Sequence, residues 1–84
     1  MREQEVGNVL HYFTHISVGV VQLTGTLRVG DTIHIKGHTT DVVQKVASMQ
    51  AEHQNIAEAK AGQSIGLKVK EHVRQHDVVY KVVR

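Results

Sequence analysis

The excess of β-branched residues constrains the fold of this chain more than any other feature of its sequence. Fifteen valines and five isoleucines stand against four leucines and five alanines. Branching at Cβ restricts the side-chain torsion χ1, which suits a pleated sheet better than a helix. Seven glycines are available to turn the chain, and there is no proline. We therefore expect an all-β fold whose turns rely on glycine, aspartate and asparagine.

Length and composition limit how the chain is organised. We expect one domain over residues 1–84, because chains usually divide only beyond about 150 residues. There is no cysteine, so neither a disulfide nor a thiolate ligand is available. The first residues are polar and charged, and no run approaches the ~18 apolar residues of a membrane span. These features predict a cytoplasmic protein with no membrane partner.

Apolar residues gather in short runs between turn signals, which is typical of a domain built from short strands. The predicted strands are 6–13, 16–23, 32–36, 41–50, 64–70 and 78–83. The first two runs do not alternate cleanly, which predicts a bulge at Gly7 or Gly19 or burial on both faces. Segment 51–63 has Ile56 as its one large apolar residue, so we expect a loop with at most one helical turn. About six strands without a βαβ pattern predict a small antiparallel barrel or sandwich.

Three ordered segments of the sequence carry a family resemblance. Residues 25–37 read G-T-L-R-V-G-D-T-I-H-I-K-G, residues 56–69 read I-A-E-A-K-A-G-Q-S-I-G-L-K-V, and residues 77–80 read D-V-V-Y. In this order and spacing they resemble the second domain of translational GTPases such as elongation factor Tu, across nearly the whole chain. The resemblance implies a six-stranded antiparallel Greek-key β-barrel, here as a freestanding domain. His76 stands where the family has glycine before the last aspartate.

Five residues of these motifs are expected to shape turns or close approaches rather than chemistry. Glycine reaches backbone conformations that side chains resist, and an aspartate can bond to its own turn. A glycine inside a strand predicts a bulge or the close approach of a neighbour. The residues are Gly25, Gly30, Asp31, Gly62 and Gly66.

The motifs that bind guanine nucleotides in such GTPases are absent from the sequence. There is no G-x-x-x-x-G-K-[ST] phosphate loop and no N-K-x-D motif, so we expect no GTP binding by this chain alone and no cofactor. In elongation factor Tu the barrel holds aminoacyl-tRNA through a Glu, an Arg and an Asn. Alignment on the shared Ala-Gly places Gln50, His53 and Ser64 at those positions. The family's tRNA-binding residues are therefore replaced here.

Histidine is unusually frequent, and protonation of all seven histidines raises the formal net charge from +2 to +9. Three pairs have H-x-x-x-H spacing, which on a strand separates the residues by about 13 Å, too far to share a metal ion. We therefore expect no metal site and histidines solvated on the outer face. The three serines do not lie in a G-x-S-x-G motif, so the sequence predicts a protein that is not an enzyme. The histidine pairs are His11 with His15, His34 with His38, and His72 with His76.

Basic residues that alternate with apolar ones predict an outward basic face and suggest an RNA-binding module. Such binding would be directed at the RNA backbone, with ribosomal or other structured RNA, or a translation-associated complex, as the partner. The alternative is a protein-interaction adaptor without RNA binding. An exposed apolar patch would favour the adaptor, and clustered charge would favour RNA. The candidate RNA-binding residues are Lys36, Lys45, Lys68, Lys70 and Arg74, and Lys81 is expected to point outward as well.

Overall fold

The computed structural model describes residues 2–83 and is all-β in this range, as the valine-rich sequence predicts. Its ten strands are β1 (Arg2–Phe13), β2 (Val18–Leu23), β3 (Leu27–Arg28), β4 (Thr32–Lys36), β5 (Asp41–Lys45), β6 (Met49–Ala51), β7 (Gln54–Ile56), β8 (Glu58–Ala59), β9 (Ser64–Lys68) and β10 (Val78–Val83). Eight of them form one antiparallel sheet in the order β5-β4-β10-β1-β2-β9-β6-β7, and β3 pairs with β8 in a second sheet. The expected strand count of six is therefore wrong.

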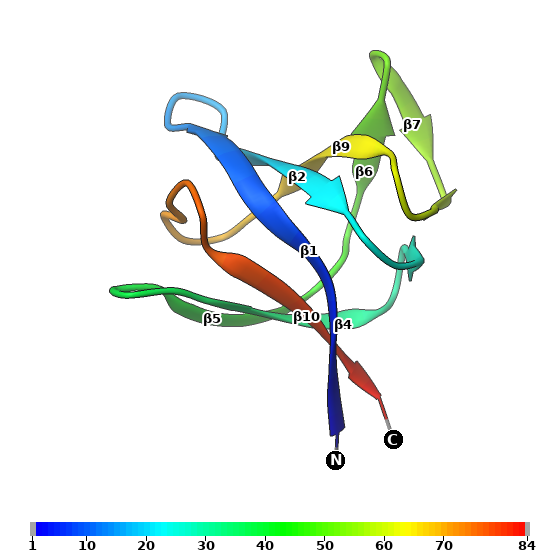
Figure 1. Cartoon of the computed structure of the whole chain (residues 1–84). Helices are drawn as coiled ribbons and strands as arrows, with labels where there is room; N and C mark the ends of the chain where they lie inside the picture. The colour runs from blue at the N-terminus through cyan, green and yellow to red at the C-terminus, as the bar shows by residue number, and fades with distance from the viewer. Residues whose placement is uncertain (1, 84) are drawn as a thin grey trace.

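The large sheet curls around the core, and its two ends do not join into a closed ladder (Figure 1). Between β5 and the segment after β9, a side chain takes the place of a strand pairing. The Gln44 amide donates from Nε2 to the Lys68 carbonyl at 2.9 Å and accepts at Oε1 from the Lys70 N–H at 2.9 Å. A side-chain amide has the same donor and acceptor as a peptide group, so it can bridge the gap between the two segments.

Strand β1 is longer than predicted, and it is irregular, as its imperfect alternation predicts. It begins at Arg2 instead of residue 6 and pairs with both β10 and β2. Its register shifts between Glu5 and Gly7 against β10, and between Val9 and His11 against β2. The first shift lies beside Gly7, one of the two positions expected for a bulge, whereas the β2–β9 pairing passes through Gly19 without a shift.

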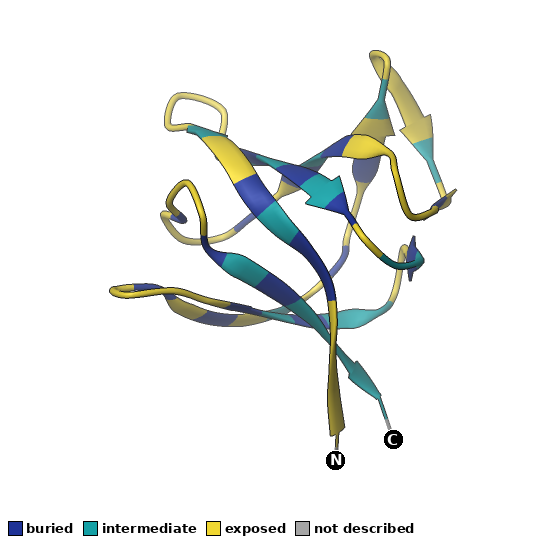
Figure 2. Ribbon diagram, viewed as in Figure 1, coloured by how far each residue is buried: buried dark blue, intermediate teal, exposed yellow. Residues whose placement is uncertain are grey.

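Buried positions recur along the strands of the curled sheet (Figure 2). The core that they form consists of aliphatic side chains. Ile33 and Ile35 of β4 are fully buried while the residues between and beside them are partly or wholly exposed, as the alternation predicts. Ile65 and Leu67 of β9 are buried in the same way, and Val69 follows them inward. The described residues contain no helix of the length and hydrophobicity needed to cross a membrane.

The region 41–63 differs most from its predicted structure. The strand expected at 41–50 divides into β5 and β6, because Val46 leaves the ladder to exchange backbone hydrogen bonds with Gly30 and Asp31 at 2.9 and 2.8 Å. The loop expected at 51–63 contains β7 and β8. Strands β6 and β7 meet at Glu52 and His53, which both have left-handed φ values of 52° and 65°. Asn and Gly usually occupy such positions, so the sequence carried no signal for this hairpin.

The glycines of the family motifs fall into two groups. Gly30 and Gly62 have left-handed φ values of 98° and 94°, with open space around the position of a Cβ atom. At Gly25 and Gly66 a neighbour approaches instead: a Cβ would lie 3.3 Å from a Val6 methyl or a Val18 methyl, respectively. Close backbone approach, rather than backbone conformation, accounts for glycine at these two positions.

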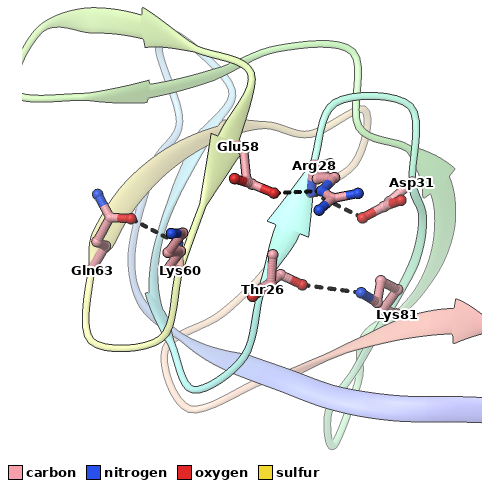
Figure 3. A network of polar contacts seen from close by, with 7 residues as sticks. All are labelled: Thr26, Arg28, Asp31, Glu58, Lys60, Gln63 and Lys81. Carbon is pink, nitrogen blue, oxygen red and sulfur yellow. Dashed lines mark hydrogen bonds and ion pairs between the residues drawn. The ribbon is translucent and has the colours of Figure 1, made fainter.

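The small β3–β8 sheet lies beside the turn that leads into β4 (Figure 3). The Arg28 side chain forms an ion pair with Glu58 across the two strands, with Nε 2.5 Å from Oε2. The backbone N–H of Arg28 donates to the Asp31 carboxylate at 2.9 Å. Lys81 was expected to point outward, but it is partly buried and donates from Nζ to the Thr26 carbonyl at 3.2 Å. This contact joins the last strand to the β2–β3 connection.

Candidate functional site

Apolar side chains are exposed together where β1 turns into β2. Phe13 and Ile16 have exposed fractions of 46% and 56%, and Leu10 reaches 39%. Phe13 pairs with Val18, which pairs in turn with Lys68 of β9, so these side chains share the outer face of the sheet. We call the outward side chains of this region the hairpin face; they are Leu10, His11, Phe13, Ile16, Val18, Val20, Gln50 and Lys68, with Gly66 among them.

A groove of about 290 Å³ crosses the hairpin face at Gly66. Gly66 lies between Val20 and Gln50, its partners in the two neighbouring strands. Because glycine has no side chain, the surface of the sheet has a depression at this position. Ile16 and Val18 supply apolar lining, whereas Ser48, Gln50 and Lys68 supply polar lining. We call this feature the Gly66 groove.

Carboxylates are absent from the parts of the strands that form the hairpin face. The sequences of β2, β6 and β9 contain no Asp or Glu, and residues 6–13 of β1 contain none either. The Lys68 ammonium donates one hydrogen bond to the Ile16 carbonyl at 2.8 Å, which leaves further N–H donors at the groove. A cation with no anion on the surrounding strands favours a partner that brings negative charge.

The positions aligned with the tRNA-binding residues of elongation factor Tu do not meet in one hollow. Gln50 lines the Gly66 groove and donates to the Asn55 side chain at 3.1 Å. Ser64 lines a separate hollow of about 620 Å³ beside the β6–β7 hairpin and donates to Gln22 at 2.8 Å. His53 lies in the left-handed turn and lines neither hollow.

The five predicted RNA-binding residues are all exposed, but they lie in different environments. Lys45 adjoins Gln44, whose amide bonds to the backbone at Lys68 and Lys70, so these three lysines flank the gap between β5 and β9. The ammonium of Lys36 lies 5.8 Å from the Tyr80 ring centroid, in cation–π range. Arg74 belongs to the turn before β10.

His34 is the ionisable residue with the most extensive side-chain contacts, and the sequence did not reveal them. Its Nδ1 lies 2.6 Å from Glu3 Oε2 and its Nε2 lies 2.5 Å from Asp41 Oδ1, with only 14% of the side chain exposed. Hydrogen bonds to Glu3 and then to Asp41 raise the pKa of His34 above its usual 6.5, because both favour the cation. The expectation that this histidine is solvated is wrong.

Other histidines pack against aromatic rings. His11 lies edge-on to Phe13, and His72 lies against Tyr12, each with ring centroids 4.5 Å apart. Within residues 2–83, no three side chains of His, Asp or Glu are placed together to hold a metal ion. The histidines with defined contacts therefore act in packing and ion pairing.

Residues 17–75 match the family described as elongation factor Tu domain 2. The chain belongs to the elongation factor Tu domain 2 family. Its fold is also that of a solved relative: the C-terminal domain of a Geobacillus thermoleovorans protein described as a U32 peptidase. That structure superimposes with a TM-score of 0.89 over 95% of this chain and 93% of the other, at 22% identity.

Among curated proteins, this elongation factor Tu domain 2 family member is similar to proteins with peptidase names. The uncharacterized protease MJ0090 of Methanocaldococcus jannaschii is 40% identical over 80 residues, which cover 94% of this chain and 20% of that protein. A collagenase of Porphyromonas gingivalis is 40% identical over 78 residues, which cover 90% of this chain and 22% of that protein. The chain thus spans about a fifth of the length of these relatives.

The peptidase names of these relatives overturn the expectation that the protein is not an enzyme. That expectation rested on missing catalytic motifs in 84 residues. The two peptidase-named relatives match this chain over only about a fifth of their own length, so motifs missing from these 84 residues do not decide the question. Fold resemblance to a translation factor domain likewise identifies the barrel and leaves the biochemical role to be argued from its surface.

Proposed function

We propose that this chain is a domain of a peptidase-type enzyme and that it binds polypeptide through the hairpin face. The observation that carries the proposal is the 40% identity over 94% of the chain to a protein named as a protease. An accessory barrel that holds a polypeptide near a peptidase domain would raise its effective concentration there.

The composition of the hairpin face supports polypeptide as the partner. Phe13 and Ile16 are about half exposed, one at the end of β1 and the other in the turn between β1 and β2. Contiguous exposed apolar side chains are typical of protein-binding surfaces. The expectation from sequence was that such a patch favours an adaptor over an RNA-binding module.

The test is a fluorescence-anisotropy titration of labelled gelatin and of unfolded casein with the 84-residue chain. Saturable binding of either polypeptide is expected, and Phe13→Ser should weaken it. Val43→Ser is the matched control, because Val43 is 51% exposed on β5, a strand that contributes no residue to the hairpin face. Absence of binding to both polypeptides would refute the proposal.

RNA binding is the second candidate, supported by the three lysines that flank the gap between β5 and β9. Such binding would weaken steeply with salt, because each neutralised phosphate releases counterions. The combined change of Lys68 and Lys70 to glutamate should reduce binding of a ribosomal RNA hairpin more than Lys60→Glu, an exposed position between β8 and β9. A hairpin that does not bind at low salt would exclude this candidate.

A further inference from the structure

The Gly66 groove combines an apolar wall, a polar rim and one cation in a small volume. Ile16 and Val18 form the wall, and the groove measures about 290 Å³. A Cβ on residue 66 would lie 3.3 Å from the Val18 methyl, so even one added carbon would intrude into this space. The groove therefore exists because residue 66 is glycine.

Lys68 stands at this groove with part of its hydrogen-bonding capacity unused. Its Nζ donates to the Ile16 carbonyl, which fixes the ammonium beside the apolar wall. An ammonium has three N–H donors, so two remain for a partner. None of the six lining residues is acidic, and Lys45 and Lys70 lie near Lys68 through the Gln44 bridge.

We infer that the Gly66 groove binds an extended polypeptide segment that carries an acidic and an aliphatic residue two positions apart. The inference rests on the proposed function and names the partner of the same face. Side chains two residues apart point the same way along an extended segment. Of two such side chains, the aliphatic one packs on Ile16 and Val18, while the carboxylate of the other accepts from Lys68.

The lining argues for a polypeptide in this groove rather than a nucleic acid. Single-stranded nucleic acids are held by aromatic rings that stack on bases and by several cations along the backbone. The six groove-lining residues include no aromatic side chain and only one cation. Serine and glutamine at the rim can instead meet peptide N–H and carbonyl groups.

The decisive experiment compares three labelled eight-residue peptides in which leucine and a variable residue lie two positions apart. They are repeats of Glu-Gly-Leu-Gly, Ser-Gly-Leu-Gly and Lys-Gly-Leu-Gly, called here the Glu-Leu, Ser-Leu and Lys-Leu peptides. The unmodified chain should bind the Glu-Leu peptide about fivefold more tightly than the Ser-Leu peptide at low salt, and the Lys-Leu peptide most weakly. Lys68→Glu should reverse the order, so that the Lys-Leu peptide binds best. Lys60→Glu is the matched control and should keep the original order.

Gly66→Ala provides a second variant that leaves the charge unchanged. It should weaken the binding of all three peptides, because the added methyl fills the groove, and thermal melts establish that the variant is folded. Equal affinity for the three peptides in the unmodified chain would overturn the inference even if gelatin or casein still binds, in which case the proposed function stands without it. A single-stranded RNA that displaces the Glu-Leu peptide and binds more tightly would overturn it in favour of nucleic acid.

Discussion

Two turns of the barrel share one hydrogen-bonding pattern but differ at their third residue. The turn at 28–31 reads R-V-G-D and leads into β4, and the turn at 74–77 reads R-Q-H-D and leads into β10. In each turn, the backbone N–H of the arginine donates to Oδ2 of the aspartate, at 2.9 Å in the first turn and 2.8 Å in the second. The backbone N–H of the aspartate donates back to the arginine carbonyl at 3.1 Å in both.

The third residue has a left-handed backbone in both turns, although only one of them is glycine. Gly30 has φ 98° and His76 has φ 76°. Each also donates its N–H to another part of the barrel: Gly30 to the Val46 carbonyl at 2.9 Å and His76 to the Val9 carbonyl at 2.8 Å. The arginine–aspartate exchange and these tertiary bonds therefore define the turn, and glycine lowers its conformational cost.

The two aspartates differ in burial. Asp31 is partly exposed, whereas Asp77 has an exposed fraction of only 4%. The Asp77 carboxylate fills the space beside Gly37, where a Cβ would lie 1.8 Å from its Oδ1. Water can replace the lost carboxylate at 28–31 but has less access at 74–77, so the same chemical change should have unequal effects.

The largest expected effect is that of Asp77→Ala. It removes a buried carboxylate and leaves the Arg74 backbone N–H without its partly buried acceptor, which should lower the free energy of unfolding by about 2–3 kcal/mol. Asp31→Ala should lower it by only about 0.5–1 kcal/mol, because the exposed turn can be solvated. Urea denaturation of both variants measures the difference, and equal losses would show that burial does not distinguish the turns.

Gly37→Ala tests whether Asp77 acts through this position. The added Cβ should push the carboxylate away from Arg74, so the variant should be nearly as unstable as Asp77→Ala. The double variant should lose much less than the sum of the two single losses, because both changes disrupt one contact. Full additivity in the same urea experiment would assign the effect of Gly37→Ala to another neighbour.

After the changes at Asp77 and Gly37, the next largest expected effect is that of Gly30→Val. No atom lies within 4 Å of the Cβ position, so the change introduces backbone strain without a clash. A left-handed conformation at a β-branched residue should cost about 1–3 kcal/mol. Lys36→Ala, at an exposed position of β4, should change stability by less than about 0.5 kcal/mol. Thermal melts in which both variants match the unmodified chain would contradict this role of Gly30.

The strands that flank these turns were predictable from sequence, whereas the intervening region was not. β4 and β10 follow Gly-Asp or His-Asp and carry clear β-branched runs. The end of β5 depends instead on hydrogen bonds from Val46 to the turn at 28–31, which are contacts distant in sequence. Propensity describes local preference, and tertiary pairing overrides it there.

The candidate site also has features that were predictable from sequence and features that were not. A close approach at Gly66 follows from a glycine within a strand and was expected. The exposure of Phe13 and Ile16 was not, because the turn between β1 and β2 decides which apolar residues leave the core. The contact between His34 and Glu3 was missed because the predicted first strand began at residue 6, while β1 begins at Arg2.

Replacement of His76 tests whether the second turn carries the strain that glycine relieves in the first. His76→Gly should release about 1–2 kcal/mol of left-handed strain. The unfolded chain gains freedom from the new glycine, which offsets roughly 0.5–1 kcal/mol of this gain. A net stabilisation of about 0.5–1 kcal/mol is expected in urea denaturation. A loss of stability would mean that the histidine side chain contributes a favourable contact that outweighs its strain.

The smallest expected effect is that of replacing His34. It distinguishes carboxylates that accept from backbone amides from carboxylates that contact a titrating side chain. Asp31 and Asp77 accept from amides, whose charge does not change with pH, whereas Glu3 and Asp41 hold His34. Because the folded pKa of His34 is raised above 6.5, its contribution is fully present below about pH 6.5 and is lost as pH rises through the folded value.

His34→Gln should therefore destabilise the chain at pH 6 and have little effect at higher pH, once the imidazole is neutral. The difference should be below about 1 kcal/mol, because Asp41 is 79% exposed and solvent screens the pair. Urea denaturation at several pH values measures it, with Asp31→Ala as the control whose effect should stay constant over the same range. A His34→Gln effect that grows with rising pH would have the wrong sign for a cation held by two carboxylates.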